Sequence, residues 1–139
     1  MPSFGTSSLA KLETCDYRLI ALFQEVVKDE DCQVIQGART KAEELDDIAR
    51  GVSRLTDPMD SKHVVDPLTR PLALAVDVAP YPVDWTKSGR FCYFAGYVMK
   101  TARIIRIVRL RTVSLNVRAS PCRLARSVDG TICAAVFAM

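Results

Sequence analysis

Residues 32–50 read Cys32-Gln-Val-Ile-Gln-Gly-Ala-Arg-Thr-Lys-Ala-Glu-Glu-Leu-Asp-Asp-Ile-Ala-Arg50, and this stretch decides the type of fold. Cys32–Gln36 is short, carries β-branched residues and is flanked by turn-forming residues, which predicts a strand. Thr40 is followed three residues later by Glu43, the pattern of a capping box. We therefore predict a helix from Thr40 to about Arg50, so the domain combines a strand with a helix.

The flanking segments predict the remaining elements. Apolar residues at helical spacing indicate a first helix from Ser7 or Ser8 to about Lys28, and residues 52–72 resemble a loop. Further along, we expect a buried strand, an aromatic-rich helix and another strand, at 74–79, about 88–105 and 107–111. This order predicts an α+β fold, with a small antiparallel sheet and helices packed on it, because the connections are too short for several right-handed crossovers.

Size and composition exclude several classes of protein. The 139 residues suit one domain, and 49% of them are hydrophobic, enough for a compact core. No apolar run is long enough for a membrane span, and the N-terminus lacks the pattern of a signal peptide. The five cysteines form no C-x-x-C pair, which favours reduced thiols. We expect cytoplasmic synthesis; the oligomeric state stays open.

The net charge of +3 hides an asymmetry between the two ends of the chain. Residues 1–84 hold 15 acidic and 9 basic side chains, whereas residues 85–139 hold 10 basic ones and a single acid, Asp129. Periodicity is lost after Arg111. We predict a domain over residues 1–111 and an atypical basic tail over 112–139, with a frame shift near Arg111, a replaced end or disorder as hypotheses.

Two residues stand out as candidate metal ligands. His63 is the sole histidine and lies in the polar loop, where a solvated side chain is the ordinary interpretation. Asp77 lies inside the buried strand, where a carboxylate is costly unless it is paired or bound to metal. A cap or a salt bridge with an arginine would also satisfy Asp77. Imidazole and carboxylate together suit zinc.

A third candidate is Arg39, at the point where the strand passes into the helix. A guanidinium at such a position can be aimed at a carbonyl or carboxylate. The alternative is a surface salt bridge to Glu43 or Asp46.

Taken in order, these segments resemble the zinc D-alanyl-D-alanine carboxypeptidase and L-alanyl-D-glutamate endopeptidase family, which includes phage endolysins. The resemblance rests on Phe4-Gly5 followed by Ser8-Leu9, on Val34-Ile-Gln-Gly-Ala-Arg-Thr40, on Ser61-Lys-His63, and on Ala75-Val-Asp-Val-Ala-Pro-Tyr81 running into Asp84-Trp85. Each motif alone is weak, but the ordered set over residues 4 to about 110 is specific.

The resemblance implies a DD-peptidase-like fold and a zinc-dependent hydrolase of peptidoglycan stem peptides that acts at the bacterial cell wall. It implies that His63 and Asp77 are two of three zinc ligands. Arg39 would contact the substrate carbonyl, and Gln36 would support the site from the same strand. Residues from Tyr81 to Trp85 would shape one wall. A phage-encoded enzyme without a signal peptide would need a holin-like partner.

Two departures from the family pattern bear on activity. Thirteen residues separate His63 from Asp77, more than is usual, and Asp66 is an alternative ligand ranked below Asp77. The C-terminal His-x-Glu-like motif, which supplies the third ligand, is missing, and so is an acidic general base. We therefore expect an incomplete site and an impaired peptidase. The alternatives are a non-catalytic remnant that binds cell-wall peptide and, much less favoured, a basic nucleic-acid-binding protein.

Overall fold

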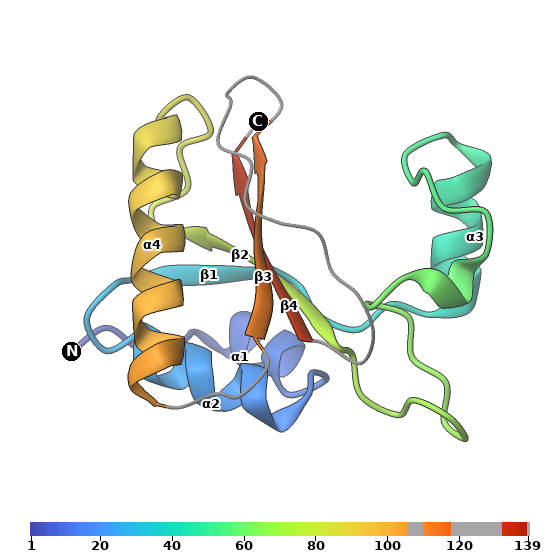
Figure 1. Ribbon diagram of the computed structural model, residues 1–139, viewed down its shortest axis with the longest axis horizontal. Helices are drawn as coiled ribbons and strands as arrows, with labels where there is room; N and C mark the ends of the chain where they lie inside the picture. The colour runs from blue at the N-terminus through green and yellow to red at the C-terminus, as the bar shows by residue number, and fades with distance from the viewer. Residues whose placement is uncertain (106–109, 118–131, 139) are drawn as a thin grey trace.

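A computed structural model describes residues 1–105 in full and the backbone of residues 110–117 and 132–138. The elements are, in chain order, α1 (Thr6–Leu12), α2 (Tyr17–Val26), β1 (Cys32–Gln36), α3 (Lys41–Ala49), a 3-10 turn (Pro58–Asp60), β2 (Ala75–Pro80), α4 (Ser88–Ile104), β3 (Leu110–Val117) and β4 (Ile132–Ala138) (Figure 1). The α+β class predicted from the sequence is confirmed.

The sheet has the strand order β1-β2-β4-β3. β1 and β2 are antiparallel, as predicted, with Cys32 opposite Pro80 and Gln36 opposite Asp77. β4 pairs in parallel with both β2 and β3, so the complete sheet is mixed. The antiparallel prediction therefore holds for the first pair only, because the chain crosses over before it adds the last two strands.

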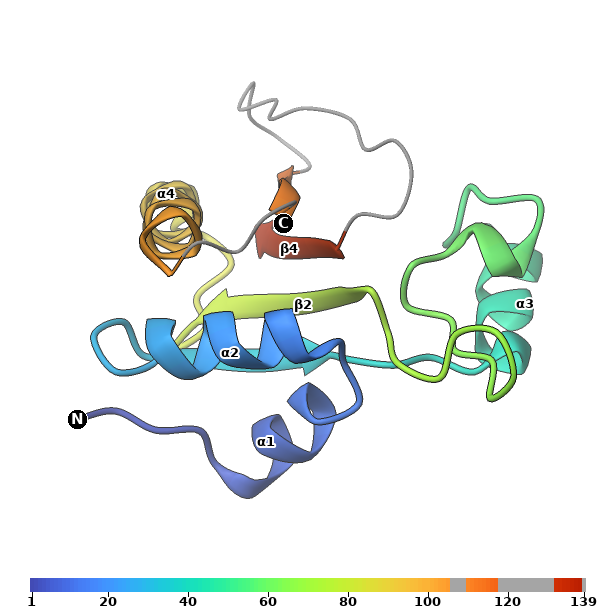
Figure 2. The ribbon, with the colours of Figure 1, turned by 60° about the horizontal axis from the view of Figure 1, so that its bottom comes forward.

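The hydrophobic core lies between the first strand pair and helices α2 and α4. Its largest members are aromatic and aliphatic side chains with almost no exposed surface: Leu12, Leu19, Leu22, Phe23, Val26, Val34, Val76, Phe91 and Phe94. Figure 2 shows α2 beside the β1–β2 pair, with α4 to one side. Burial of apolar area drives this packing, at about 25 cal/mol per Å².

The predicted helix from residue 7 to residue 28 is in fact two helices. The helix is interrupted at Cys15, whose backbone forms an isolated β-bridge with Ala73. The Asp16 amide donates to the Ala73 carbonyl at 2.8 Å. The Asp16 carboxylate then accepts the Arg18 amide and caps α2. Helical periodicity continues through the break, so the pattern of apolar residues alone did not reveal it.

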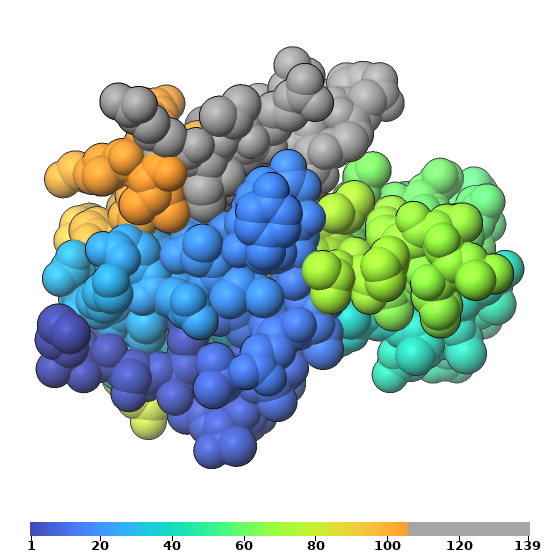
Figure 3. Space-filling view, turned by 90° about the horizontal axis from the view of Figure 1, so that it is seen from below, coloured from blue at the N-terminus to red at the C-terminus, as the bar shows by residue number. Residues whose placement is uncertain are grey.

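Residues 37–72, here called the α3 lobe, project from the main body (Figures 1 and 3). The predicted capping box is confirmed, since Thr40 Oγ1 accepts the Glu43 amide and the Glu43 carboxylate accepts the Thr40 amide. The structure describes every residue of this lobe, and Val64 and Pro58 are its only buried apolar side chains. Polar contacts must therefore hold much of the lobe in place.

Strands β3 and β4 fall largely within the segment for which the sequence predicted an atypical tail. A strand was expected at 107–111; β3 begins at Leu110, and residues 106–109 lie outside the described part. The boundary at residue 111 and the frame-shift hypothesis stay predictions. Within the described residues, no helix has both the length and the apolar character needed to cross a membrane.

Candidate metal site and its surroundings

His63 is held by the turn that follows β1. Its Nδ1 lies 2.9 Å from the carbonyl oxygen of Gly37. A carbonyl can only accept, so Nδ1 must carry the proton of this hydrogen bond. In the neutral imidazole, Nε2 is therefore the atom with a free lone pair.

Asp77 faces that lone pair from β2. Its Oδ1 lies 3.2 Å from His63 Nε2, and the two side chains are only 6% and 16% exposed. The pair meets the distance of an ion pair but not the geometry of a hydrogen bond, since buried Oδ1 has no hydrogen-bond partner among the described residues. Two acceptors at this separation repel unless a proton or a cation lies between them.

The charge of Asp77 also governs the protonation of His63. Burial by itself would lower the pKa of His63, but the neighbouring Asp77 carboxylate and the Gly37 carbonyl more than offset burial and raise that pKa above its ordinary value. The nearby Arg39 guanidinium acts in the opposite direction. In the metal-free protein, protonation of Nε2 is thus the way to relieve the repulsion.

The pair has the chemistry and spacing of two zinc ligands. Bonds of about 2.0–2.2 Å at tetrahedral angles place neighbouring ligand atoms about 3.3–3.6 Å apart, so the observed separation is close to the lower end of this range. A carbonyl that holds the far nitrogen of a ligand histidine is a common feature of metal sites. A third ligand is lacking, however: no group of three histidine, cysteine, aspartate or glutamate residues comes together within the described residues.

Arg39 is joined to this pair through the backbone. Its amide donates to the His63 carbonyl at 2.8 Å, and its own carbonyl accepts the Val65 amide at 3.0 Å. Its Nη1 lies 2.7 Å from Glu44 and 3.1 Å from Asp47. The sequence suggested a salt bridge from Arg39 to Glu43 or Asp46. In the structure Arg39 pairs instead with Glu44 and Asp47, the residues that follow these two in α3.

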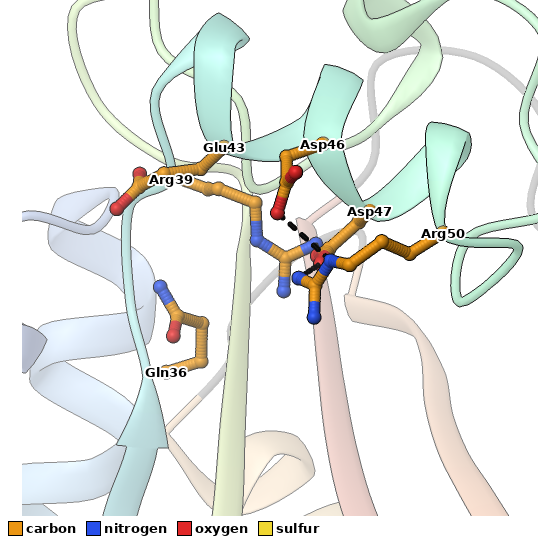
Figure 4. Close-up of a pocket in the computed structure, with 6 residues that line it drawn as sticks. All are labelled: Gln36, Arg39, Glu43, Asp46, Asp47 and Arg50. Carbon is orange, nitrogen blue, oxygen red and sulfur yellow. Dashed lines mark hydrogen bonds and ion pairs between the residues drawn. The ribbon is translucent and has the colours of Figure 1, made fainter.

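Arg39 and Gln36 line one pocket together with Glu43, Asp46, Asp47 and Arg50 (Figure 4). The Gln36 side chain donates to the Ala38 carbonyl at 3.0 Å, and the Gln36 backbone lies opposite Asp77 in the sheet. Gln36 therefore links the pocket to the His63–Asp77 pair. Neither His63 nor Asp77 lines the pocket.

Other residues considered from the sequence lie elsewhere. Asp66 Oδ1 accepts the amides of Leu68 and Thr69 and so caps a turn. Tyr81 lines a separate hollow with Ser3 and Asp31 near the start of β1, and a wall formed by Tyr81 to Trp85 stays a prediction. Asp129 lies outside the described residues.

Comparison with known proteins places the chain in a family. The model of the phage L-alanyl-D-glutamate peptidase family matches residues 2–114. The chain belongs to this family. It is also 33% identical over 87 residues to the L-alanyl-D-glutamate peptidase of Escherichia phage T5, a match that spans 59% of this chain and 58% of the relative. The resemblance inferred from the sequence is confirmed at the level of the family.

Sequence reasoning overlooked two contributors to this site. The Gly37 carbonyl orients His63, and a backbone group leaves no signal in a residue pattern. Glu44 is almost completely buried beside Arg39, but in the sequence it resembles any acid in the first turn of a helix. The sequence holds no signal for this burial, because an amphipathic helix would be expected to bury the apolar neighbour Leu45, which is exposed in the structure.

Proposed function

We propose that this chain is a zinc peptidase of peptidoglycan stem peptides, impaired because no third protein ligand joins His63 and Asp77 among the described residues. The observation that carries the proposal is the convergence of His63 Nε2 and Asp77 Oδ1 at 3.2 Å, with Nδ1 occupied by Gly37. Membership of the phage peptidase family supports the substrate class. The chain spans about 58% of the length of its T5 relative, so the activity is inferred here.

The residues present have distinct roles in this proposal. His63 and Asp77 would hold zinc, which polarises a scissile carbonyl and lowers the pKa of a bound water. Arg39 would place its guanidinium against a carbonyl or carboxylate oxygen of the substrate, where the charge of that oxygen is stabilised. Gln36 would support the wall between Arg39 and Asp77.

The impairment is inferred from the strand beside Asp77. β4 pairs with β2 so that Ala135 stands opposite Asp77, and β4 reads Ile-Cys-Ala-Ala-Val-Phe-Ala, without histidine or glutamate. A zinc ion with two protein ligands is bound more weakly than one with three. This observation favours the second candidate function, a non-catalytic protein that binds the stem peptide.

A cleavage assay on the full chain separates these functions. Isolated cell walls and a synthetic stem peptide are incubated with protein and added zinc, and products are identified by mass spectrometry, which also reveals the bond cut. We expect slow cleavage that is abolished by a chelator and by Asp77→Asn. Asp66→Asn is the matched control, because Asp66 caps a turn outside the site, and it should cleave like the original chain.

Two kinds of result would count against a zinc peptidase at this site. Cleavage that resists the chelator, or that survives Asp77→Asn, would contradict a role for zinc at this site. Stem-peptide binding without any cleavage at saturating zinc would favour the non-catalytic candidate.

A further inference from the structure

The α3 helix packs on the rest of its lobe through a charged residue. Glu44 is 1% exposed and is the one buried residue of α3, whereas Leu45 beside it is 48% exposed. Burial of a carboxylate costs free energy unless hydrogen bonds and a cation compensate, and an apolar residue would fill the same space without that cost. A glutamate at this position therefore suggests a role other than packing.

The partners of Glu44 connect both halves of the candidate site. Its Oε2 lies 2.7 Å from Arg39 Nη1, and it also accepts hydrogen bonds from the hydroxyl groups of Ser53 and Ser61. Ser61 lies two residues before His63. A single carboxylate thus holds the side chain of Arg39 and the segment that carries His63.

Glu44 is ionised at neutral pH. Burial by itself would raise the pKa of Glu44, but hydrogen bonds from Ser53 and Arg39 and the charge of Arg39 more than offset burial and lower that pKa. The ion pair with Arg39 is therefore complete under ordinary conditions, and its low exposure limits screening by salt.

The contact leaves part of the guanidinium available. Glu44 and Asp47 both engage Nη1, and neither Nη2 nor Nε of Arg39 has a hydrogen-bond partner within the described part of the chain. Arg39 lines the pocket with Gln36, so these free donors are the ones that a ligand would meet. Asp47 cannot replace Glu44 alone, because Asp47 also pairs with Arg50 at 2.6 Å.

We propose that Glu44 is a positioning residue, which holds the guanidinium of Arg39 toward the pocket and ties it to the segment of His63. This inference deepens the proposed function and rests on it for the contact between Arg39 and substrate. Glu44 itself touches no substrate. Its effect on binding passes through Arg39, so the two side chains should behave as one unit in a double-mutant cycle.

The test compares Glu44→Gln, Arg39→Ala and the double variant in the full chain. Calorimetry with the synthetic stem peptide and zinc measures binding. We expect Glu44→Gln to weaken binding about ten- to a hundredfold, the range for loss of one charge-assisted hydrogen bond. The double variant should bind no more weakly than Arg39→Ala. Glu25→Gln, an exposed acid on α2 paired with Lys28, is the control and should leave binding unchanged.

A second readout does not depend on binding or on metal. The Nε–H signal of Arg39 in nitrogen-15 NMR, assigned with Arg39→Lys, should be sharp in the original chain and should broaden or shift in Glu44→Gln. If Glu44→Gln does not fold, Ser53→Ala removes one hydroxyl from the same carboxylate and should give the same changes to a smaller degree.

The outcomes separate the inference from the proposed function. Losses that add in the double variant, or an unchanged Arg39 signal in folded Glu44→Gln, would overturn the positioning role. A changed Arg39 signal together with normal binding by Arg39→Ala would overturn the substrate role of Arg39 while the contact with Glu44 stands.

Discussion

At the scale of single residues, the site depends on which atom of His63 carries a proton. The Gly37 carbonyl fixes that proton on Nδ1, so a second proton and a metal ion compete for the position between Nε2 and Asp77 Oδ1. Zinc binding therefore displaces the proton of the imidazolium, which the raised pKa of His63 makes harder to remove. The affinity for zinc should fall as the pH falls.

The chelated protein should show a stability that depends on His63. Because its pKa is higher in the folded protein than in the unfolded chain, the imidazolium–Asp77 pair stabilises the fold fully below the unfolded value of about 6.5. That contribution is lost as the pH rises through the folded pKa. Urea unfolding of the chelated chain between pH 5 and pH 9 measures it.

His63→Gln is the control for this experiment, because glutamine does not titrate. The difference in unfolding free energy between the two chains should shrink as the pH rises. A difference that stays constant, or grows with pH, would show that Asp77 does not interact with a protonated His63.

At the scale of elements, the turn that follows β1 packs closely against the end of α1 at Gly37. A Cβ atom added there would lie 2.2 Å from the Lys11 carbonyl oxygen and 2.6 Å from Thr14 Oγ1. A backbone carbonyl cannot move aside cheaply. The same glycine presents its own carbonyl to His63, so packing and site geometry are coupled at this turn.

Gly37→Ala should therefore destabilise the fold by about 1–3 kcal/mol or more, the cost of overpacking. Thermal unfolding with and without zinc measures this loss, and zinc should stabilise the variant less than it stabilises the original chain. Gly96→Ala in α4 is the matched control. Nothing lies within 4 Å of a Cβ there, and alanine is favoured over glycine in a helix by about 1 kcal/mol. Equal effects of the two changes would contradict this packing.

The elements themselves were predictable where local chemistry dominates. The strand Cys32–Gln36 and the capping box of Thr40 and Glu43 were found from the sequence, because both depend on neighbouring residues. The break at Cys15 was not, because its cause is a bridge to Ala73, far along the chain. The parallel pairing of β4 depends on long-range contacts of the same kind.

The site was predictable to the same degree. His63 and Asp77 could be singled out because a lone histidine and a carboxylate inside an apolar strand are unusual, and the structure brings them together. The partners of Arg39 could not be assigned from the sequence. Which face of α3 points toward Arg39 depends on how the whole lobe packs. Whether these residues bind metal or substrate stays a prediction.

At the scale of the whole molecule, two parts differ in what holds them together. The main body packs α2 and α4 on the sheet through large apolar side chains, whereas the α3 lobe depends on ion pairs and hydrogen bonds around Glu44 and Arg39. Segments with little buried apolar surface open at lower free energy than the core of a domain.

Native-state hydrogen exchange should resolve this difference. The amides of Leu45 and Ile48 in α3 should exchange through a lower-energy opening than those of Leu22 and Phe94 in the core. Glu44→Gln should increase exchange in α3 and leave the core amides unchanged. Equal protection throughout the described chain would show that the lobe and the core unfold as one unit.

The central claim is that His63 and Asp77 hold one zinc ion together. The direct measurement is bound zinc per chain, determined by elemental analysis after equilibrium dialysis against a fixed concentration of free zinc. We predict one zinc for the original chain, and strongly reduced zinc for His63→Ala and for Asp77→Asn. A folded original chain that retains no zinc, or Asp77→Asn protein that retains as much as the original, would contradict the claim.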